Sequence, residues 1–220
     1  MLTIDGGRAT VPSGIFDHDG FRAWARSGDV SEGVRVAFIQ GEVLLEMSPE
    51  STESHSKPKG TITSALWRIV DERDAGEAYP DRVLLTNVEA ELSTEPDFVF
   101  ASWEAFESGR LRLVTKSNRQ DDYVELEGTP DLVVEIISDA SVRKDEELLR
   151  RAYHRAGVPE YWLIDARYEL SFVILHHTSD GYVPGAPNGE PQPSRVLGLR
   201  FELARATNRL GRWRYSLTTV

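Results

Sequence analysis

The hydrophobic pattern of the first third of the chain changes from helical to alternating and back to helical. Residues 17–27 place two aromatic side chains on one helical face, behind an aspartate that can cap the helix. Residues 34–45 alternate with period two on both sides of a Gln40-Gly41 turn signal. Residues 53–73 carry aliphatic side chains at helical spacing. The pattern predicts a helix, a β-hairpin and a longer helix.

The middle of the chain is divided into short segments of alternating polarity. Such segments predict strands at residues 82–86, 89–93, 97–101 and 123–128. A helical turn is expected at residues 103–108, and the polar residues 115–121 are expected to form a loop.

The second half of the chain carries the strongest apolar run. Residues 131–137 are nearly all apolar, which is typical of a strand buried on both faces. A helix is predicted over 143–156, ended by Gly157, and a second buried strand over 160–165. This order predicts a parallel, right-handed crossover. Antiparallel signals follow, so we expect one domain of the α/β (α+β) class with a mixed sheet.

The composition is that of an ordinary globular chain. The 220 residues are 40% hydrophobic and 28% charged, which fits one domain with a real core. Cysteine is absent, so disulfides and thiolate metal ligands are excluded. No stretch reaches the roughly 20 apolar residues that span a bilayer, and residues 1–14 lack the pattern of a signal peptide. We therefore expect a cytoplasmic protein with no membrane partner.

The formal net charge of −11 argues against a protein that coats nucleic acid by bulk electrostatic attraction. It does not exclude a nuclease, because metal-binding carboxylates add negative charge and a local basic strip can suffice. Arg150, Arg151 and Arg155 form the strip that best fits phosphate contact, with a solvated helix face as the alternative.

Two carboxylates stand in otherwise apolar strands. Glu135 lies inside the run VVEII, where burial is costly unless the group is paired or binds a metal. Asp97 opens the strand DFVFA directly after Pro96. The alternatives are a strand glutamate paired with an arginine and a turn aspartate after proline.

The distance between carboxylates determines which acidic residue can bind the same metal ion as Glu135. Asp131 is four residues away on the same strand, about 13 Å at about 3.3 Å per residue, whereas Mg²⁺–oxygen bonds are about 2.1 Å. A neighbouring strand lies only about 4.8 Å away. If the strand of Asp97 pairs with that of Glu135, both carboxylates can hold one divalent ion, which can activate water and stabilise charge on a phosphate.

A site of this kind needs a positive group near the attacking water or the phosphate. Ile137 shares a face with Glu135 and cannot supply one. Lys144 follows at the start of the next helix, from which it can reach back over the strand end. The alternative is a solvated lysine beside Asp145.

The segments PDLVVEI and AGVPEYWLID, joined by a helix, resemble the core of the Uma-two-type family of bacterial restriction-endonuclease homologues, formerly a domain of unknown function. The resemblance runs from QGEVLLEMSPE through EPDFVF to EYWLID, which is most of the chain. It implies a PD-(D/E)xK nuclease domain over residues 1–220, with a restriction-endonuclease-like core at about 34–178. This core has a mixed central β-sheet flanked by helices and an N-terminal β-hairpin. Residues 179–220 would be a C-terminal β extension.

The resemblance also implies site residues. Asp97 matches the acidic residue of the Pro-Asp motif and Glu135 that of the ExK-like motif. These two, with the backbone carbonyl of Ile136, would bind Mg²⁺ or Mn²⁺. Glu42 matches a further acidic position that faces the site, with an ordinary hairpin-turn glutamate as the alternative. His55 stands where members often carry a histidine, although a capping or exposed histidine is the alternative.

The chain departs from the family pattern at its lysine. Ile137 replaces the ExK lysine, and Leu149 stands where many members carry a lysine in the following helix, so Lys144 is the nearest substitute. We expect a metal-dependent endonuclease that hydrolyses DNA, with Asp97, Glu135, Lys144 and Glu42 as its catalytic residues. The alternative is a nuclease-fold protein without activity that acts as a binding or assembly module.

Other candidate positions are assigned lesser roles. His176 and His177 are neighbours on a strand and face opposite sides, so they form a poor metal pair. Tyr161 and Trp162 are expected in the core or an interface. The C-terminal segment RLGRWRYSL, rich in arginine and aromatic residues, is the basis for expecting a homodimer.

Overall fold

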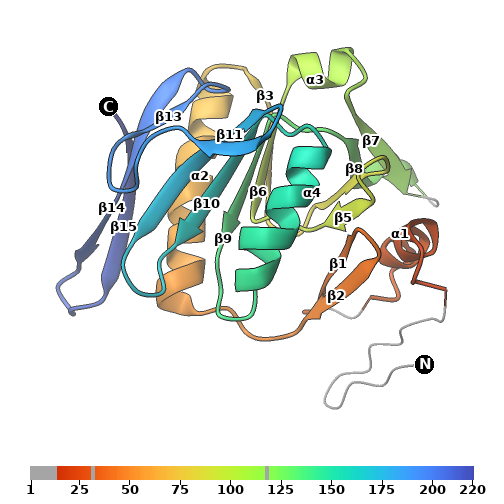
Figure 1. Ribbon diagram of the computed structural model, residues 1–220, viewed down its shortest axis with the longest axis horizontal. Coiled ribbons are helices and arrows are strands. Elements are labelled where there is room, and N and C mark those ends of the chain that lie inside the picture. Colours follow the sequence, from red (N-terminus) through yellow and green to blue (C-terminus); the bar gives the residue numbers. More distant parts are fainter. Residues whose placement is uncertain (1–13, 31–32, 117–118) are drawn as a thin grey trace.

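The described part of the chain forms two six-stranded sheets and a three-stranded sheet, with helices packed against them (Figure 1). The computed structural model describes residues 14–30, 33–116 and 119–220. The N-terminal segment in which we expect no signal peptide lies outside these ranges, apart from Gly14. Among the described residues, no helix combines the length and the apolar character needed to cross a membrane.

The first sheet contains the predicted hairpin and has the order β2-β1-β5-β4-β8-β7. Its strands are β1 (Arg35–Ile39), β2 (Glu42–Glu46), β4 (Leu84–Asn87), β5 (Leu92–Thr94), β7 (Leu111–Lys116) and β8 (Arg119–Gly128). The hairpin is confirmed, and Gln40 and Gly41 turn with positive φ angles of 51° and 87°. Helix α1 (His18–Ser27) packs on this sheet, and the Asp17 side chain caps its start.

The second sheet has the order β12-β11-β10-β9-β6-β3. Its strands are β3 (Gly76–Pro80), β6 (Phe98–Ser102), β9 (Leu132–Ile136), β10 (Glu160–Asp165), β11 (Ser171–Thr178) and β12 (Gly181–Pro184). Strands β9 and β10 are parallel, as predicted. Strand β6 pairs antiparallel with β9, so the strand that begins after Asp97 does lie beside the strand of Glu135.

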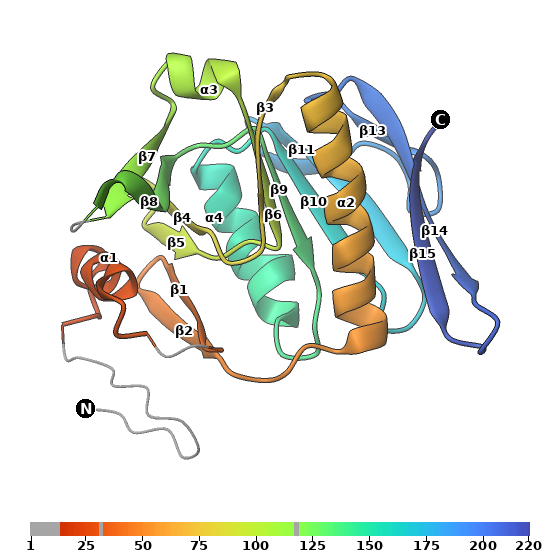
Figure 2. The same ribbon diagram turned by 180° about the vertical axis from the view of Figure 1, so that it is seen from behind.

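Two helices cover opposite faces of the second sheet (Figure 2). Helix α2 (Lys57–Glu72), preceded by the π-helical turn η1 (Thr52–Ser56), packs on one face. Helix α4 (Arg150–Arg155) continues the turn η2 (Lys144–Leu149) on the other face, where its apolar residues join a core shared by both six-stranded sheets. A short helix, α3 (Trp103–Glu107), follows β6. The predicted core positions of Tyr161 and Trp162 are confirmed, because both are fully buried.

The chain ends in a three-stranded antiparallel sheet of β13 (Gln192–Ser194), β14 (Leu199–Thr207) and β15 (Trp213–Thr219). Its buried side chains pack with those of α2 and the second sheet, so α2 is enclosed between two sheets. The turn between β14 and β15 lies at the same end of the molecule as the start of α2 (Figures 1 and 2).

The structure corrects three expectations about the strands. Most of the predicted loop 115–121 is strand, because β7 and β8 pair as a hairpin whose polar side chains are largely exposed and carry no apolar pattern. Strand β3 was not predicted; it is an edge strand held by backbone pairing with β6. The strands over 84–94 belong to the sheet of the hairpin, a second sheet beside the expected mixed central sheet, and the chain crosses from one to the other just before β6.

Candidate active site

A polar cavity of about 540 Å³ lies where the two six-stranded sheets meet. Asp97, Glu135, Ile136, His55 and Lys144 all line it. Five predicted site residues from four separate segments therefore reach one cavity. Its other charged lining residues are Arg35, Glu46, Glu50, Asp81, Arg82, Asp139 and Asp145.

Asp97 stands at the crossing between the sheets and is only 2% exposed. Its Oδ2 accepts a hydrogen bond of 2.8 Å from the backbone N–H of Ile136, next to Glu135. Its Oδ1 lies 3.4 Å from Arg35 Nη1 and 3.5 Å from Lys59 Nζ. Burial alone would raise the pKa of Asp97, but His55, Lys59 and the Ile136 N–H outweigh it and hold the pKa well below its usual range. These contacts favour the charged form of the Asp97 carboxylate.

Glu135 lies within β9 and is also only 2% exposed. Its Oε1 accepts a hydrogen bond of 2.6 Å from the Tyr153 hydroxyl of α4. Burial, and next the negative charges of Asp145 and Asp97, raise the pKa of Glu135 well above its usual range, although Lys144 opposes this. A carboxyl group in such a place needs a proton or a cation.

Lys144 begins η2 and reaches into the cavity, where its side chain is 12% exposed. Its Nζ lies 3.2 Å from Glu46 Oε1 and 3.6 Å from Asp145 Oδ1. Burial would lower the pKa of Lys144, but Asp145, Glu135 and Glu46 raise it, so the ammonium group stays charged. Ile137 and Leu149 are buried apolar side chains, so Lys144 supplies the positive charge on this side of the cavity.

Asp145 is a cavity residue that the sequence analysis treated only as a neighbour of Lys144. It is 1% exposed, and its Oδ2 accepts a hydrogen bond from the Ser141 hydroxyl. Its Oδ1 is buried and has no hydrogen-bond partner among the described residues. Burial raises the pKa of Asp145 to about 7, although Lys144 and Ser141 oppose this. The spacing of four residues between Ser141 and Asp145, at a helix start, was the available sequence signal.

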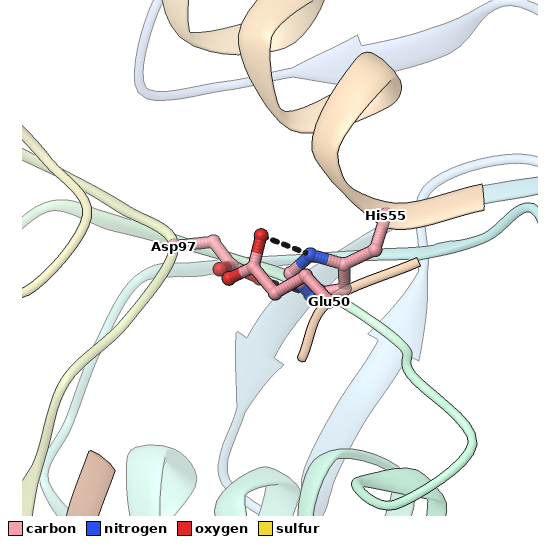
Figure 3. Close-up of side chains that lie close together, drawn as sticks. All are labelled: Glu50, His55 and Asp97. Carbon is pink, nitrogen blue, oxygen red and sulfur yellow. Dashed lines mark ion pairs between the residues drawn. The ribbon is translucent and has the colours of Figure 1, made fainter. Parts of the chain in front are cut away.

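Glu50, His55 and Asp97 form a compact group on the other side of the cavity (Figure 3). One ligand atom from each lies within 4.8 Å of the others. His55 comes from turn η1; its Nδ1 lies 3.1 Å from Glu50 Oε2 and its Nε2 lies 3.5 Å from Asp97 Oδ2. Burial would lower the pKa of His55, but the negative charges of Asp97 and Glu50 outweigh burial, so this pKa lies above its usual value. Glu50, in the loop after β2, was missed by the sequence analysis.

Two carboxylates and an imidazole within this distance could hold a divalent metal ion. The Nδ1 atom of His55 is buried without a well-formed hydrogen bond among the described residues, although it faces Glu50. Glu135 also lacks a cationic hydrogen-bond partner in the described part of the chain. Both observations fit a cavity that accepts a cation.

Glu42 is the predicted site residue that the structure does not bring to the cavity. Its side chain is 40% exposed and pairs with Arg143 at 2.7 Å on the surface. Glu46 lines the cavity instead. Glu42 and Glu46 share a face of β2, but four residues separate them by about 13 Å along the strand.

Three other groups of residues lie outside the cavity. Asp131 accepts hydrogen bonds from the Ser102 N–H and from Arg110, which fixes the start of β9. His176 and His177 point apart on β11, and His177 bonds the carbonyl of His154. The arginines predicted as a phosphate-contacting strip lie on α4, outside the cavity lining: Arg150, Arg151 and Arg155.

The fold and the acidic cavity define the class of nuclease-fold proteins related to restriction endonucleases. A crystal structure of a protein titled a "putative nuclease belonging to DUF820" from Anabaena variabilis ATCC 29413 shares this fold, with a TM-score of 0.60. The match covers 83% of this chain and 90% of that chain at 15% sequence identity. No curated protein matches the chain.

The sequence profile of the Uma2 family, described as "Putative restriction endonuclease", matches residues 19–207. The chain therefore belongs to the Uma2 family, which confirms the resemblance and the fold class expected from the sequence. Membership of this family supports a nuclease function.

Proposed function

We propose that the protein is an endonuclease that uses Mg²⁺ or Mn²⁺ to hydrolyse DNA phosphodiester bonds. The observation that carries the proposal is the meeting of Asp97, Glu135 and Lys144 in one cavity of a nuclease-family fold. Two buried carboxylates on adjacent strands and one buried ammonium group are the parts that metal-assisted phosphodiester hydrolysis requires.

Asp97, Glu135 and the backbone carbonyl of Ile136 would hold the ion, with His55 and Glu50 beside Asp97. Their oxygen-rich donor set suits Mg²⁺ or Mn²⁺, and the imidazole of His55 favours Mn²⁺ over Mg²⁺. When bound, the ion would supply an acidified water and a positive charge for the phosphate.

The side chains around these ligands would position the reacting groups. Lys144 keeps its proton and would place a positive charge where the phosphate gains negative charge. Glu46 and Asp145 hold the ammonium group between them and so fix its direction. Arg35 bonds Glu50 at 2.5 Å and Asp81 at 2.6 Å, which keeps a second cation at the cavity wall.

A second candidate function is a binding or assembly module without catalysis. Two observations favour it: Ile137 stands at the position of the usual motif lysine, and Arg35, Lys59 and His55 already surround Asp97. Such a protein would bind no divalent ion at Asp97, and Asp97→Asn would leave its ligand binding unchanged.

Cleavage and metal binding separate the two functions. Supercoiled, linear and single-stranded DNA would be incubated with Mg²⁺ or Mn²⁺, and Mn²⁺ binding would be measured by calorimetry. The nuclease proposal predicts that Glu135→Gln abolishes cleavage and weakens Mn²⁺ binding at least tenfold. The exposed Glu72→Gln on α2 is the matched control and should behave as the wild type. Undiminished cleavage by Glu135→Gln would overturn the assignment.

Three further properties stay proposals. Residues 1–220 would act as one domain with the core at 34–178. Deletion of the β extension 179–220 should then destabilise the core, since Phe201 packs against Trp162 with ring centroids 4.8 Å apart. Homodimer formation and a cytoplasmic location would be tested by light scattering and by cell fractionation.

A further inference from the structure

The turn between β14 and β15 is an arginine-rich surface in an acidic protein. Residues 205–214, here called the arginine hairpin, contain four arginines and no carboxylate, whereas the whole chain has a net charge of −11. They are Arg205, Arg209, Arg212 and Arg214. The proposed function makes no use of this segment.

Three of these guanidinium groups are available to a partner. Arg209, Arg212 and Arg214 are exposed. Among the described residues, none of the three forms an ion pair within 4.0 Å of a carboxylate. Arg35 in the cavity lining is instead paired with Glu50 and Asp81. The arginine hairpin is therefore a region of net positive potential that is suited to a polyanion.

An aromatic ring is held within this basic surface. The guanidinium of Arg205 lies 4.3 Å from the centroid of the Trp213 ring, which is 38% exposed. The same guanidinium donates hydrogen bonds to the carbonyls of Ala166 at 3.1 Å and Tyr168 at 2.7 Å. Arg205 thus fixes the ring in place and leaves part of it open to solvent. An exposed ring among arginines can stack on a nucleic-acid base.

The arginine hairpin is fixed to the turn that supplies His55 to the candidate active site. The Trp213 N–H donates to Glu53 Oε2 at 2.9 Å, and Lys57 Nζ donates to the Trp213 carbonyl at 3.0 Å. The Tyr215 hydroxyl donates to the Glu53 carbonyl at 2.9 Å. His55 lies between Glu53 and Lys57 in the chain and faces the cavity. Both views of the fold place the β14–β15 turn and the start of α2 at one end of the molecule.

We propose that the arginine hairpin binds the phosphate backbone of nucleic acid and holds the strand that enters the candidate active site. The inference rests on the proposed function and names the surface that positions its substrate. Charge complementarity favours this occupant, because guanidinium groups match phosphates. Glu53 is the carboxylate that contacts the hairpin, and it bonds the Trp213 N–H rather than an arginine. A second copy of the chain, expected from the same segment in the sequence analysis, would have to bury these arginines against an acidic surface.

The test is nucleic-acid binding without divalent metal. A fluorescein-labelled oligonucleotide, as single strand and as duplex, would be titrated in EDTA with fluorescence anisotropy as the readout. The double variant Arg209→Gln/Arg212→Gln would be compared with Arg112→Gln/Arg119→Gln. The control also removes two exposed positive charges, but from β7 and β8 at the opposite end of the molecule (Figure 1).

We expect the hairpin variant to bind nucleic acid more weakly than the wild type. The difference between the two should become smaller as the salt concentration rises. Loss of two phosphate contacts lowers the slope of log K against log salt by about 1.8 for duplex DNA. Between about 50 and 200 mM salt, the wild type should lose about tenfold more affinity than the hairpin variant. The control variant should follow the wild type.

Two results would overturn the inference. One is equal binding by the hairpin and control variants. The other is a change of oligomeric state in Arg209→Gln/Arg212→Gln with unchanged nucleic-acid affinity, which would assign the surface to a second copy. Binding is measured in EDTA and does not require cleavage. A protein that binds nucleic acid through the arginine hairpin but does not cleave it would therefore contradict the proposed function and still support this inference.

Discussion

The hydroxyl of Tyr153 donates a hydrogen bond of 2.6 Å to Oε1 of Glu135, and both side chains are buried between α4 and β9. This bond opposes the burial that raises the pKa of Glu135. A hydroxyl from the helix therefore helps to keep a strand carboxylate available as an anion. The relationship connects the packing of α4 with the chemistry proposed for the cavity.

Tyr153→Phe should move the pH dependence of cleavage. The variant removes a bond that favours the charged form, so the pKa of Glu135 should rise further. If only ionised Glu135 binds the metal, the acidic limb of the pH–rate profile should move to higher pH, with activity regained in alkali. Stability should fall by about 1–2 kcal/mol.

Tyr182→Phe is the matched control for this variant. The Tyr182 hydroxyl is also buried, but it donates to the Val158 carbonyl at 2.7 Å, away from Glu135. Its loss should cost similar stability and leave the pH–rate profile in place. A profile that moves equally in both variants, or in neither, would contradict the role given to Tyr153.

Lys144→Ala should reduce the cleavage rate by roughly 100- to 1000-fold, the cost of removing one donor that stabilises transition-state charge. Lys144→Arg should retain part of the rate, because it keeps the positive charge. Rates would be measured at saturating Mn²⁺, with thermal melting to verify folding. Lys116→Ala, an exposed lysine of β7, is the control. Full activity in folded Lys144→Ala would show that this lysine does not replace the motif lysine.

The sequence was most informative where burial is complete. The run 131–137 and the strand 160–165 are apolar enough to predict a parallel pair in the middle of a sheet, and Asp97 follows from the adjacent strand. These elements depend on the local hydrophobic pattern and on pairing between neighbouring strands, and both can be predicted from a single sequence. The place of Lys144 at the helix start could also be predicted.

The remaining parts of the cavity depend on how distant elements meet. Glu50 reads as a loop residue and Asp145 as a solvated helix-start residue. Both line the cavity only because the hairpin sheet closes over the ends of β6 and β9, which buries Asp145 and leaves Glu50 partly exposed. Glu42 was expected at the site from the family resemblance. It shares a face of β2 with Glu46, and only the packing of the sheets decides that Glu46 lines the cavity.

Glu95→Gln should stabilise the protein at alkaline pH. Burial raises the pKa of Glu95 to about 7, against the opposing charges of Arg82 and Arg35, and its buried Oε2 has no hydrogen-bond partner in the described part of the chain. Because the folded state holds this proton more tightly than the unfolded state, the contribution is present below about pH 4.5 and is lost as pH rises through about 7.

Urea denaturation at pH 5 and pH 8 would measure this effect. Glutamine does not ionise, so the variant should lie close to the wild type near pH 5, where most of the contribution remains, and exceed it by about 1–3 kcal/mol at pH 8. The exposed Glu107→Gln of α3 should show no such difference between the two pH values. A variant with the same gain at both pH values would show that ionisation of Glu95 is not the cause.

Arg22→Ala should destabilise the protein, because it removes a positive partner from the buried carboxylate of Glu125. The guanidinium of Arg22 bonds both carboxylate oxygens of Glu125, at 2.9 and 3.2 Å, and Glu125 is 2% exposed. Removal of one partner from a buried pair typically costs about 3–5 kcal/mol. Arg26 also lies 3.0 Å from Glu125, so we expect a loss of about 2–4 kcal/mol here.

The pair of the exposed Arg112 with Glu127, a carboxylate that Arg22 also bonds at 2.5 Å, gives the comparison for this variant. Its distance is 2.6 Å, but the Arg112 side chain is 68% exposed, so Arg112→Ala should cost less than about 1 kcal/mol. Urea midpoints of the two variants would be compared at equal m-values. Since Arg22 joins α1 to β8, its loss should also increase proteolysis within α1. Equal urea midpoints for the two variants would mean that Arg26 alone is sufficient to stabilise the buried charge of Glu125.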